Sequence, residues 1–215
     1  MGGRDWGRWA SWTGVVFGVL LFLGVMVGGS TPDSDASPQK VAAFYTSHHS
    51  GQQASVFLIA YSLVFGLFFA GALRSYLRAR SSGDGLIAVG FAGMAVLAAS
   101  AAVLAGVNFG ATDVPTKISP DALQALNVLQ NDVFFGLLVG TCVFLIGNGL
   151  AIVRSAAAAL PAWLGWVAAA LGVLAVTPIG WIVLLFALPL WSVIVSVLMF
   201  VRQAAPAPAA APVTG

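Results

Sequence analysis

The sequence predicts an all-α protein, a polytopic membrane helix bundle of six transmembrane helices with two short helices at the outer membrane surface. Two features of composition and one of pattern indicate this fold class. Of the 215 residues, 60% are hydrophobic and only 7% are charged, against about 25% charged in a soluble domain. Residues 161–201 also run without any Asp, Glu, Lys, Arg or His. The bilayer is therefore the expected solvent of the chain.

The charge-free stretch 161–201 is too long for one span. As a straight helix it would measure about 60 Å, roughly twice the hydrocarbon thickness of a bilayer. Proline removes an amide donor and disfavours helix in the residue before it, and glycine tolerates a reversal of the chain. The sequence Thr177-Pro178-Ile179-Gly180 is therefore the expected turn of a helical hairpin.

Six segments are long and apolar enough to be interpreted as spans. They comprise residues 9–28, 54–73, 86–107, 133–153, 162–176 and 180–201, of which the fifth is short for a full crossing. We expect them to form a single domain over residues 1–202. Residues 203–215 are rich in Ala and Pro without an apolar period, which predicts a disordered cytoplasmic tail.

Basic residues predict the orientation, because short loops rich in Lys and Arg stay in the cytoplasm. In a six-span arrangement the arginines all fall on one side: Arg4, Arg8, Arg74, Arg78, Arg80, Arg154 and Arg202. Only Lys40 and Lys117 fall on the other side. We therefore expect a multi-pass protein of the cell (inner or plasma) membrane with both termini in the cytoplasm.

The two outer loops share one pattern. Ser37-Pro38 and Ser119-Pro120 each combine a serine that can cap a helix with a proline suited to its first turn, and the two pairs are 82 residues apart. Each loop should contain a short surface helix, and the second helix should continue into span 133–153. Each half of the chain thus consists of a span, a surface helix, a second span and a closing basic residue. This order is either an internal repeat whose two copies have the same orientation in the membrane, or the order that any two helical hairpins would show.

Polar residues gather toward the outer side of the predicted bundle. Gln124, Asn127 and Asn131 recur at three- and four-residue spacing and share one helix face. The candidate contacts for a ligand or partner are Asn127, Asn131, Asp132, Asn108, Tyr45 and His49. They could line an outward-opening pocket, or the amides could hydrogen-bond to neighbouring helices and fix the surface helices on the bundle.

Pro189 lies in the middle of the last predicted span. It should kink that helix and free a backbone carbonyl. The kink would serve either as a hinge for transport or as a packing feature.

No catalytic residue, cofactor site or metal site is predicted. No ionisable residue lies at the middle of a span, so there is no lysine for a retinal Schiff base and no histidine pair for haem. The chain contains no Glu and no HExxH, GxSxG or phosphate-loop motif. His48 and His49 are adjacent, so they point in different directions on a helix, without a nearby Cys or Glu. The net charge of +2 is too small to indicate a nucleic-acid partner.

Four stretches follow one another between Ala122 and Val201: ALQALNVLQNDVFFG, LAIVR, LPAWLGWVAAALGVLAV and ALPLWSVIVSVLMF. This order resembles that of a family of small, uncharacterised multi-pass membrane proteins of high-GC bacteria. The resemblance implies the six-span fold, and no activity follows from it.

Three classes of function remain. The preferred one is a non-catalytic integral membrane protein that acts through association, as an accessory subunit or scaffold; its partners are the lipid bilayer and a membrane protein partner or a second copy. The alternative is a small transporter or binder of an apolar or neutral solute with an outward-facing pocket. A membrane-embedded enzyme is disfavoured because no set of acid, base, nucleophile or metal ligands is visible. An open cavity at Asn127, Asn131 and Asp132 would favour the binder, and helices closed around them would favour association.

Overall fold

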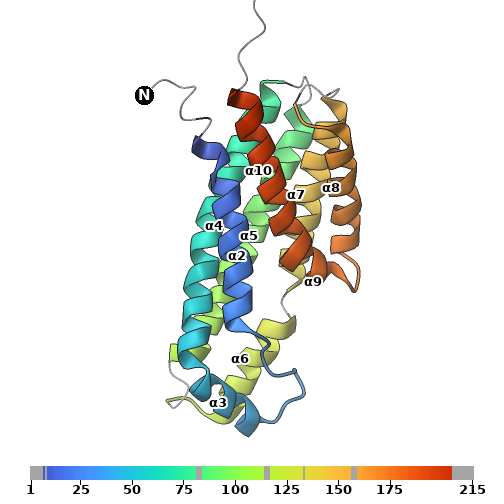
Figure 1. Cartoon of the computed structure of the whole chain (residues 1–215). Helices are drawn as coiled ribbons and strands as arrows, with labels where there is room; N and C mark the ends of the chain where they lie inside the picture. The colour runs from blue at the N-terminus through green and yellow to red at the C-terminus, as the bar shows by residue number, and fades with distance from the viewer. Residues whose placement is uncertain are drawn as a thin grey trace, which may run out of the picture.

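The computed structural model describes residue 7 and residues 9–80, 84–113, 117–132, 134–155 and 159–204. Within these ranges the chain is helical between short turns and contains no strand, which confirms the all-α class. The helices are α2 (Thr13–Gly28), α3 (Pro38–Ser47), α4 (His49–Arg78), α5 (Asp84–Asp113), α6 (Pro120–Asp132), α7 (Phe135–Arg154), α8 (Ala162–Ala175), α9 (Gly180–Ile182), the π-helical turn η1 (Val183–Ala187) and α10 (Leu188–Ala204). Figure 1 shows an upright bundle with α3 and α6 at one end.

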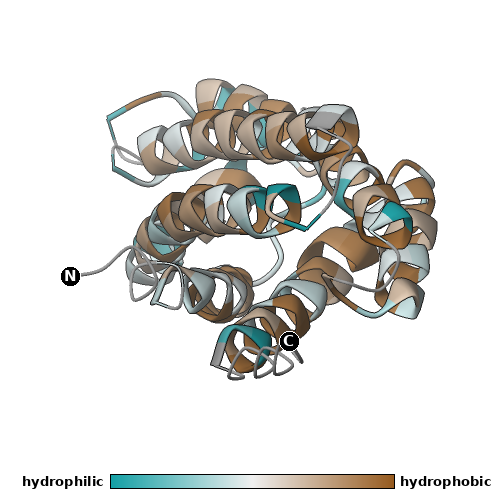
Figure 2. Ribbon diagram, turned by 90° about the horizontal axis from the view of Figure 1, so that it is seen from above, coloured by the Kyte–Doolittle hydropathy of each residue, from teal (hydrophilic) through white to brown (hydrophobic). Residues whose placement is uncertain are grey.

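The long helices are hydrophobic on all sides. On α2, Val19, Phe22 and Met26 are 47%, 40% and 50% exposed although their side chains are apolar. Figure 2, a view along the bundle, shows hydrophobic residues on helices all around it. Helices of this kind are covered by protein or lipid. Five are long and apolar enough to cross a membrane, which identifies a multi-pass membrane protein: Trp9–Gly28, His49–Arg78, Gly85–Asp113, Pro120–Arg154 and Gly180–Gln203.

The predicted C-terminal hairpin is present, but its first arm is short. Helix α8 has 14 residues and rises about 21 Å, against about 30 Å for the hydrocarbon layer. The structure thus has five helices of spanning length where the sequence predicts six spans. The turn is at the predicted place, with the Gly180 N–H donating to Thr177 O at 2.8 Å. A Cβ at Gly180 would collide with the Ala175 carbonyl, so glycine is required there.

The irregularity predicted at Pro189 is a π-helical turn. Pro189 has no N–H for the carbonyl of Leu185, and the turn η1 directly precedes α10. In this turn the Leu188 N–H donates to Val183 O, five residues back. A Cβ at Gly18 of α2 would lie 2.8 Å from Pro189 O, so the two helices are in close contact at this point. Extra turns of this kind are frequent at functional sites.

Glycines allow α5 and α7 to pack backbone to backbone. A Cβ at Gly93 would collide with the backbone of Phe144, and a Cβ at Gly140 would collide with the backbone of Leu97. Small residues at such contacts are typical of membrane helices, which gain stability from close van der Waals packing. Phe144 then stacks edge-to-face on Trp191 of α10, with ring centres 5.8 Å apart. These contacts join α5 to α7 and α7 to α10.

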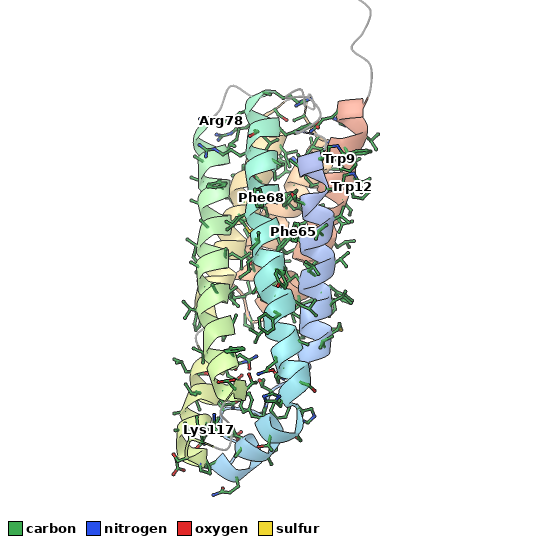
Figure 3. All side chains as sticks on the ribbon, turned by 90° about the vertical axis from the view of Figure 1, so that its left-hand side faces the viewer. Trp9, Trp12, Phe65, Phe68, Arg78 and Lys117 are labelled. Atoms are coloured by element: carbon green, nitrogen blue, oxygen red, sulfur yellow. The ribbon has the colours of Figure 1, made fainter. Side chains whose placement is uncertain are left out.

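The two ends of the bundle differ in charge. Figure 3 shows Arg78 with Trp9 and Trp12 toward one end and Lys117 at the other. At the arginine end, the Tyr76 hydroxyl and Arg202 Nη1 donate to the carbonyl of Ala159 at 2.8 and 2.9 Å. The arginines of α4 and α10 thus share one end, as the predicted topology requires, while the side of the membrane stays a prediction. Arg4, Arg8 and residues 205–215 of the predicted tail lie outside the described ranges.

The Ser-Pro pairs start two short helices as expected. Ser37 Oγ accepts from the Lys40 N–H at 3.4 Å, and Ser119 Oγ accepts from the Ala122 N–H at 3.3 Å. Within the expected continuation from residue 120 to residue 153, α6 ends at Asp132 and α7 begins at Phe135, and residue 133 between them lies outside the described ranges. Helix α6 packs on α3 (Figure 1).

Candidate functional site

Residues 31–47 and α6 form a cap on the bundle with a small hydrophobic core of its own. The buried members of this core come from both halves of the chain: Ala36, Val41, Tyr45, Ala111 and Leu123. Val41 and Leu123 are both fully buried, and each stands four residues after its capping serine. The two short helices therefore pack on each other through equivalent faces.

Tyr45 is the polar centre of the cap. Its side chain is fully buried, and its hydroxyl lies 3.3 Å from Asn127 Oδ1 and 3.1 Å from Gln130 Oε1. Burial raises the pKa of Tyr45 from 10.0 to about 12, because a phenolate loses more hydration than a phenol does. The hydroxyl therefore keeps its proton at neutral pH and acts as a hydrogen-bond donor.

Asn127 and Asn131 fasten the loop that precedes α3. Their Nδ2 atoms donate to the same carbonyl, that of Pro32, at 3.0 and 2.9 Å. Asn131 Oδ1 also accepts from the hydroxyl of Thr31 at 3.1 Å. Asn127 is fully buried with both ends of its amide hydrogen-bonded, so it is closed to a ligand. These contacts correspond to amides that fix the outer segments rather than to an open pocket.

The other three candidate residues are spread out. Asp132 is exposed, and its Oδ1 lies 3.5 Å from the hydroxyl of Ser34. His49 begins α4, and its side chain makes no hydrogen bond within the described part of the chain. Asn108 is buried in α5, and its Nδ2 donates to Gln52 Oε1 at 3.0 Å. Only Tyr45, Asn127 and Asn131 of the six therefore form one cluster.

The sequence pattern misses Gln52 and Gln130. Gln52 is buried and its Nε2 donates to the carbonyl of Gly28 at 2.6 Å, while Ser55 donates to the carbonyl of Gly24 at 2.7 Å. Gln52 just precedes the predicted span 54–73 and Ser55 lies within it. Their three-residue spacing, matched by glycines on the neighbouring span, is the signal that could have found this contact. Gln130 stands three residues after Asn127, and the same spacing rule could have included it.

A cavity of about 220 Å³ lies inside the bundle, and we call it the bundle cavity. Its walls come from α2, α4, α5, η1 and the junction of α6 with α7. Asn108 and Gln130 are its polar lining residues, and its apolar lining includes Phe17, Leu104 and Leu184. The cavity therefore has a polar part at the cap and an apolar part within the bundle.

A groove of about 740 Å³, the α4/α5 groove, runs along the outside of these two helices. The α5 side of this groove consists mainly of small residues: Ala95, Ala98, Ala99, Ala102, Ala105 and Gly106. The rings of Phe57 and Phe109 meet edge-to-face, 6.0 Å apart, across the groove. Val56, Leu63 and Ala105 line both the groove and the bundle cavity, so these side chains are the wall between them.

A third hollow, the hairpin notch, has a volume of about 510 Å³ and lies beside the turn between α8 and α9. Its lining includes Phe134, Phe135, Thr177 and Trp181. Figure 1 shows that this turn stops well short of the cap. None of the polar residues of the cap is among the residues that line the notch. Phe134 lines both the notch and the bundle cavity.

Among the described residues, no group of three or more His, Cys, Asp or Glu is placed to hold a metal ion. No family model, curated protein or solved structure matches the chain. Function therefore has to be inferred from the cap, the bundle cavity and the α4/α5 groove themselves.

Proposed function

We propose that this chain is a non-catalytic integral membrane protein that acts through association within the bilayer, as an accessory subunit or scaffold. In this proposal it crosses the cell membrane six times, α8 being a short sixth span that locally thins the bilayer. The arginine end and both termini face the cytoplasm, and the cap faces outward with α3 and α6 at the membrane surface.

The cap supports association over an open binding site. Helices closed around Asn127 and Asn131 are the arrangement expected of a structural cluster, and both amides are engaged with the loop at Pro32. A buried hydrogen-bonded amide offers no group to a passing solute without first breaking its own bonds. The hydrogen bonds of the cap therefore favour a rigid structural role for it over the binding of a solute.

The observation that carries the proposal is the exposed face of α4 beside its groove. Phe57, Tyr61, Val64 and Phe68 follow each other at helical spacing and are 52%, 61%, 50% and 55% exposed. Figure 3 shows Phe68 well below Arg78, toward the middle of the bundle. These side chains form a ridge, and the small residues of α5 next to them form the groove. A ridge beside a groove is the shape that one membrane helix offers another.

Tyr61 adds a polar reason for a partner. Its hydroxyl makes no hydrogen bond within the described residues, and it stands about 20 Å along α4 from Arg74, at hydrocarbon depth. A hydroxyl that faces lipid cannot exchange hydrogen bonds with water. A backbone carbonyl or hydroxyl of a neighbouring helix would satisfy it.

A second copy of the chain fits this face best. Because ridge and groove lie side by side on one surface, a two-fold axis between them places the ridge of each copy in the groove of the other. Ala102 lies in the groove and is exposed, so a larger side chain there would fill the space that the ridge of the second copy needs.

The test compares Ala102→Leu and Tyr61→Leu with Ala170→Leu in lipid nanodiscs. Ala170 is exposed on α8, away from the groove, so it receives the same added volume on a different face. We expect a dimer for the native chain and for Ala170→Leu. For Ala102→Leu and Tyr61→Leu we expect self-association to be weaker by at least about tenfold, which corresponds to about 1.4 kcal/mol. Subunit counting by single-molecule photobleaching measures this. A native chain that stays monomeric, or three variants that behave alike, would contradict the proposal.

The binder of a neutral solute, the second function considered, has one observation in its favour, which is the bundle cavity. No cluster of acid, base and nucleophile in the described residues favours an enzyme.

A further inference from the structure

The hydrogen bonds around Gln52 fix the orientation of the Asn108 amide. Gln52 Nε2 donates to the carbonyl of Gly28 at 2.6 Å, which leaves Gln52 Oε1 as the end that faces Asn108. Asn108 must then present its Nδ2, which donates to that oxygen at 3.0 Å. A flipped amide at either position would bring two acceptors or two donors together. The oxygen of Asn108 is therefore turned away from Gln52.

Asn108 Oδ1 is a buried acceptor without a donor. The residue is 8% exposed, and its oxygen has no hydrogen-bond partner within the described chain. Asn108 lines the bundle cavity. Buried polar atoms in native proteins almost always have a partner, and an exception calls for a specific explanation.

Gln130 is the second polar residue of the cavity lining. Its Oε1 lies 3.1 Å from the Tyr45 hydroxyl, and Asn127 Oδ1 lies 3.3 Å from the same hydroxyl. The hydroxyl has one proton for these two neighbours, so it leaves either end of the Gln130 amide able to face it. The cavity lining thus combines the unpaired Asn108 oxygen with one further amide.

The rest of the bundle cavity is apolar and uncharged. Its lining includes Phe17 and Leu21 of α2, Leu97 and Leu104 of α5 and Leu184 of η1, and no charged side chain. Its volume of about 220 Å³ exceeds the ~150 Å³ of an apolar cavity that remains dry and takes up benzene. A charged group would lose its hydration here without gaining a partner charge.

We propose that the bundle cavity binds one uncharged amphipathic molecule whose polar group is a hydroxyl. The hydroxyl donates to Asn108 Oδ1 beside the Gln130 amide, and the hydrocarbon part lies among Phe17, Leu104 and Leu184. This inference does not depend on self-association through the α4/α5 groove.

The experiment uses the full chain, purified and stripped of lipid, with 1-decanol as the probe and n-decane and decanoate as comparators. Equilibrium dialysis with isotope-labelled probes gives the stoichiometry and dissociation constant, with the same detergent micelles without protein as the blank. We expect one decanol per chain, bound at least about tenfold more tightly than either comparator. The alkane lacks the polar group, and the carboxylate carries a charge.

Two variants separate the cavity from general partition into the protein. Ala101 lines the cavity, so Ala101→Leu fills part of it without touching the polar network, and decanol affinity should fall at least about tenfold. Ala170→Leu, with the same added volume on exposed α8, should bind as the native chain does. Asn108→Leu should abolish the preference for decanol over decane, and its helix content by circular dichroism shows whether it is folded.

Two results would overturn the proposal. They are equal affinity for decanol and decane in the native chain and unchanged decanol binding in Ala101→Leu. If only the self-association experiment fails, the cavity proposal stands, and the reverse also holds.

Discussion

Tyr45 and Asn127 are hydrogen-bonded to each other at 3.3 Å and stand 82 residues apart, the same interval that separates the capping serines Ser37 and Ser119. The bonded residues thus occupy equivalent positions in the two units of the chain. Contact between equivalent residues is what a local two-fold axis between the two units would produce. This contact favours the internal repeat over a chance likeness of two hairpins.

Removal of the Asn127 amide should loosen the cap. In Asn127→Ala the carbonyl of Pro32 and the hydroxyl of Tyr45 lose a buried partner, and opening of the cap should become easier by about 1–3 kcal/mol. Hydrogen exchange of residues 31–47 measures this. Asp132→Asn is the control, because Asp132 is exposed and its change should stay within about 0.5 kcal/mol. Equal effects of the two variants would contradict the assigned role of Asn127.

The cap should also weaken at alkaline pH. The pKa of Tyr45 is about 12 in the folded chain against 10.0 ordinarily, so the folded state holds this proton more tightly than the unfolded state. The resulting stability is complete below pH 10 and is lost as the pH rises toward 12. Tyr45→Phe has no such proton. The stability advantage of the native chain over this variant should therefore shrink between pH 10 and 12, and a constant difference would rule the effect out.

Helix α5 should tolerate no added methyl group at its closest contact with α7. In Gly93→Ala the new Cβ would meet the backbone of Phe144, which cannot move aside as a side chain can. Overpacking of this kind costs about 1–3 kcal/mol. Gly71→Ala is the matched control, since nothing lies within 4 Å of the added carbon. Reversible unfolding in mixed micelles compares the two, and a Gly93 variant as stable as the control would show that the helices can separate.

Orientation can be read by cysteine labelling in a Cys142→Ala background. Thr46→Cys lies on exposed α3 and Ala79→Cys lies at the arginine end of α4. With a membrane-impermeant maleimide on intact cells, we expect labelling of the first variant only. Permeabilised cells should label both. The opposite pattern would reverse the topology predicted from the arginines.

Local signals in the sequence were sufficient for much of the fold. Ser-Pro pairs predict where α3 and α6 begin, Pro178 and Gly180 predict the hairpin turn, and Pro189 predicts an irregularity in the last helix, where the structure has η1. Each of these signals acts within one helical turn. The packing of α6 on α3 could not be predicted this way, because it depends on residues far apart in sequence.

The candidate site shows the same division. Spacing places Asn127 and Asn131 on one face, but their common partner is the carbonyl of Pro32, about 95 residues earlier and in no pattern. Asn108 was expected to belong to the same outer cluster, but its side chain is hydrogen-bonded to Gln52 of α4 instead. Only this three-dimensional contact reveals that the oxygen of the Asn108 amide has no partner within the described chain.

The wall formed by Val56, Leu63 and Ala105 has two faces, one toward the bundle cavity and one toward the α4/α5 groove. If a molecule in the bundle cavity pushes these side chains outward, they occupy part of the α4/α5 groove, and a partner in the groove pushes them toward the cavity. The two binding equilibria are then thermodynamically linked, and linkage is reciprocal. If decanol changes the dimer dissociation constant by some factor, dimerisation must change the affinity for decanol by the same factor.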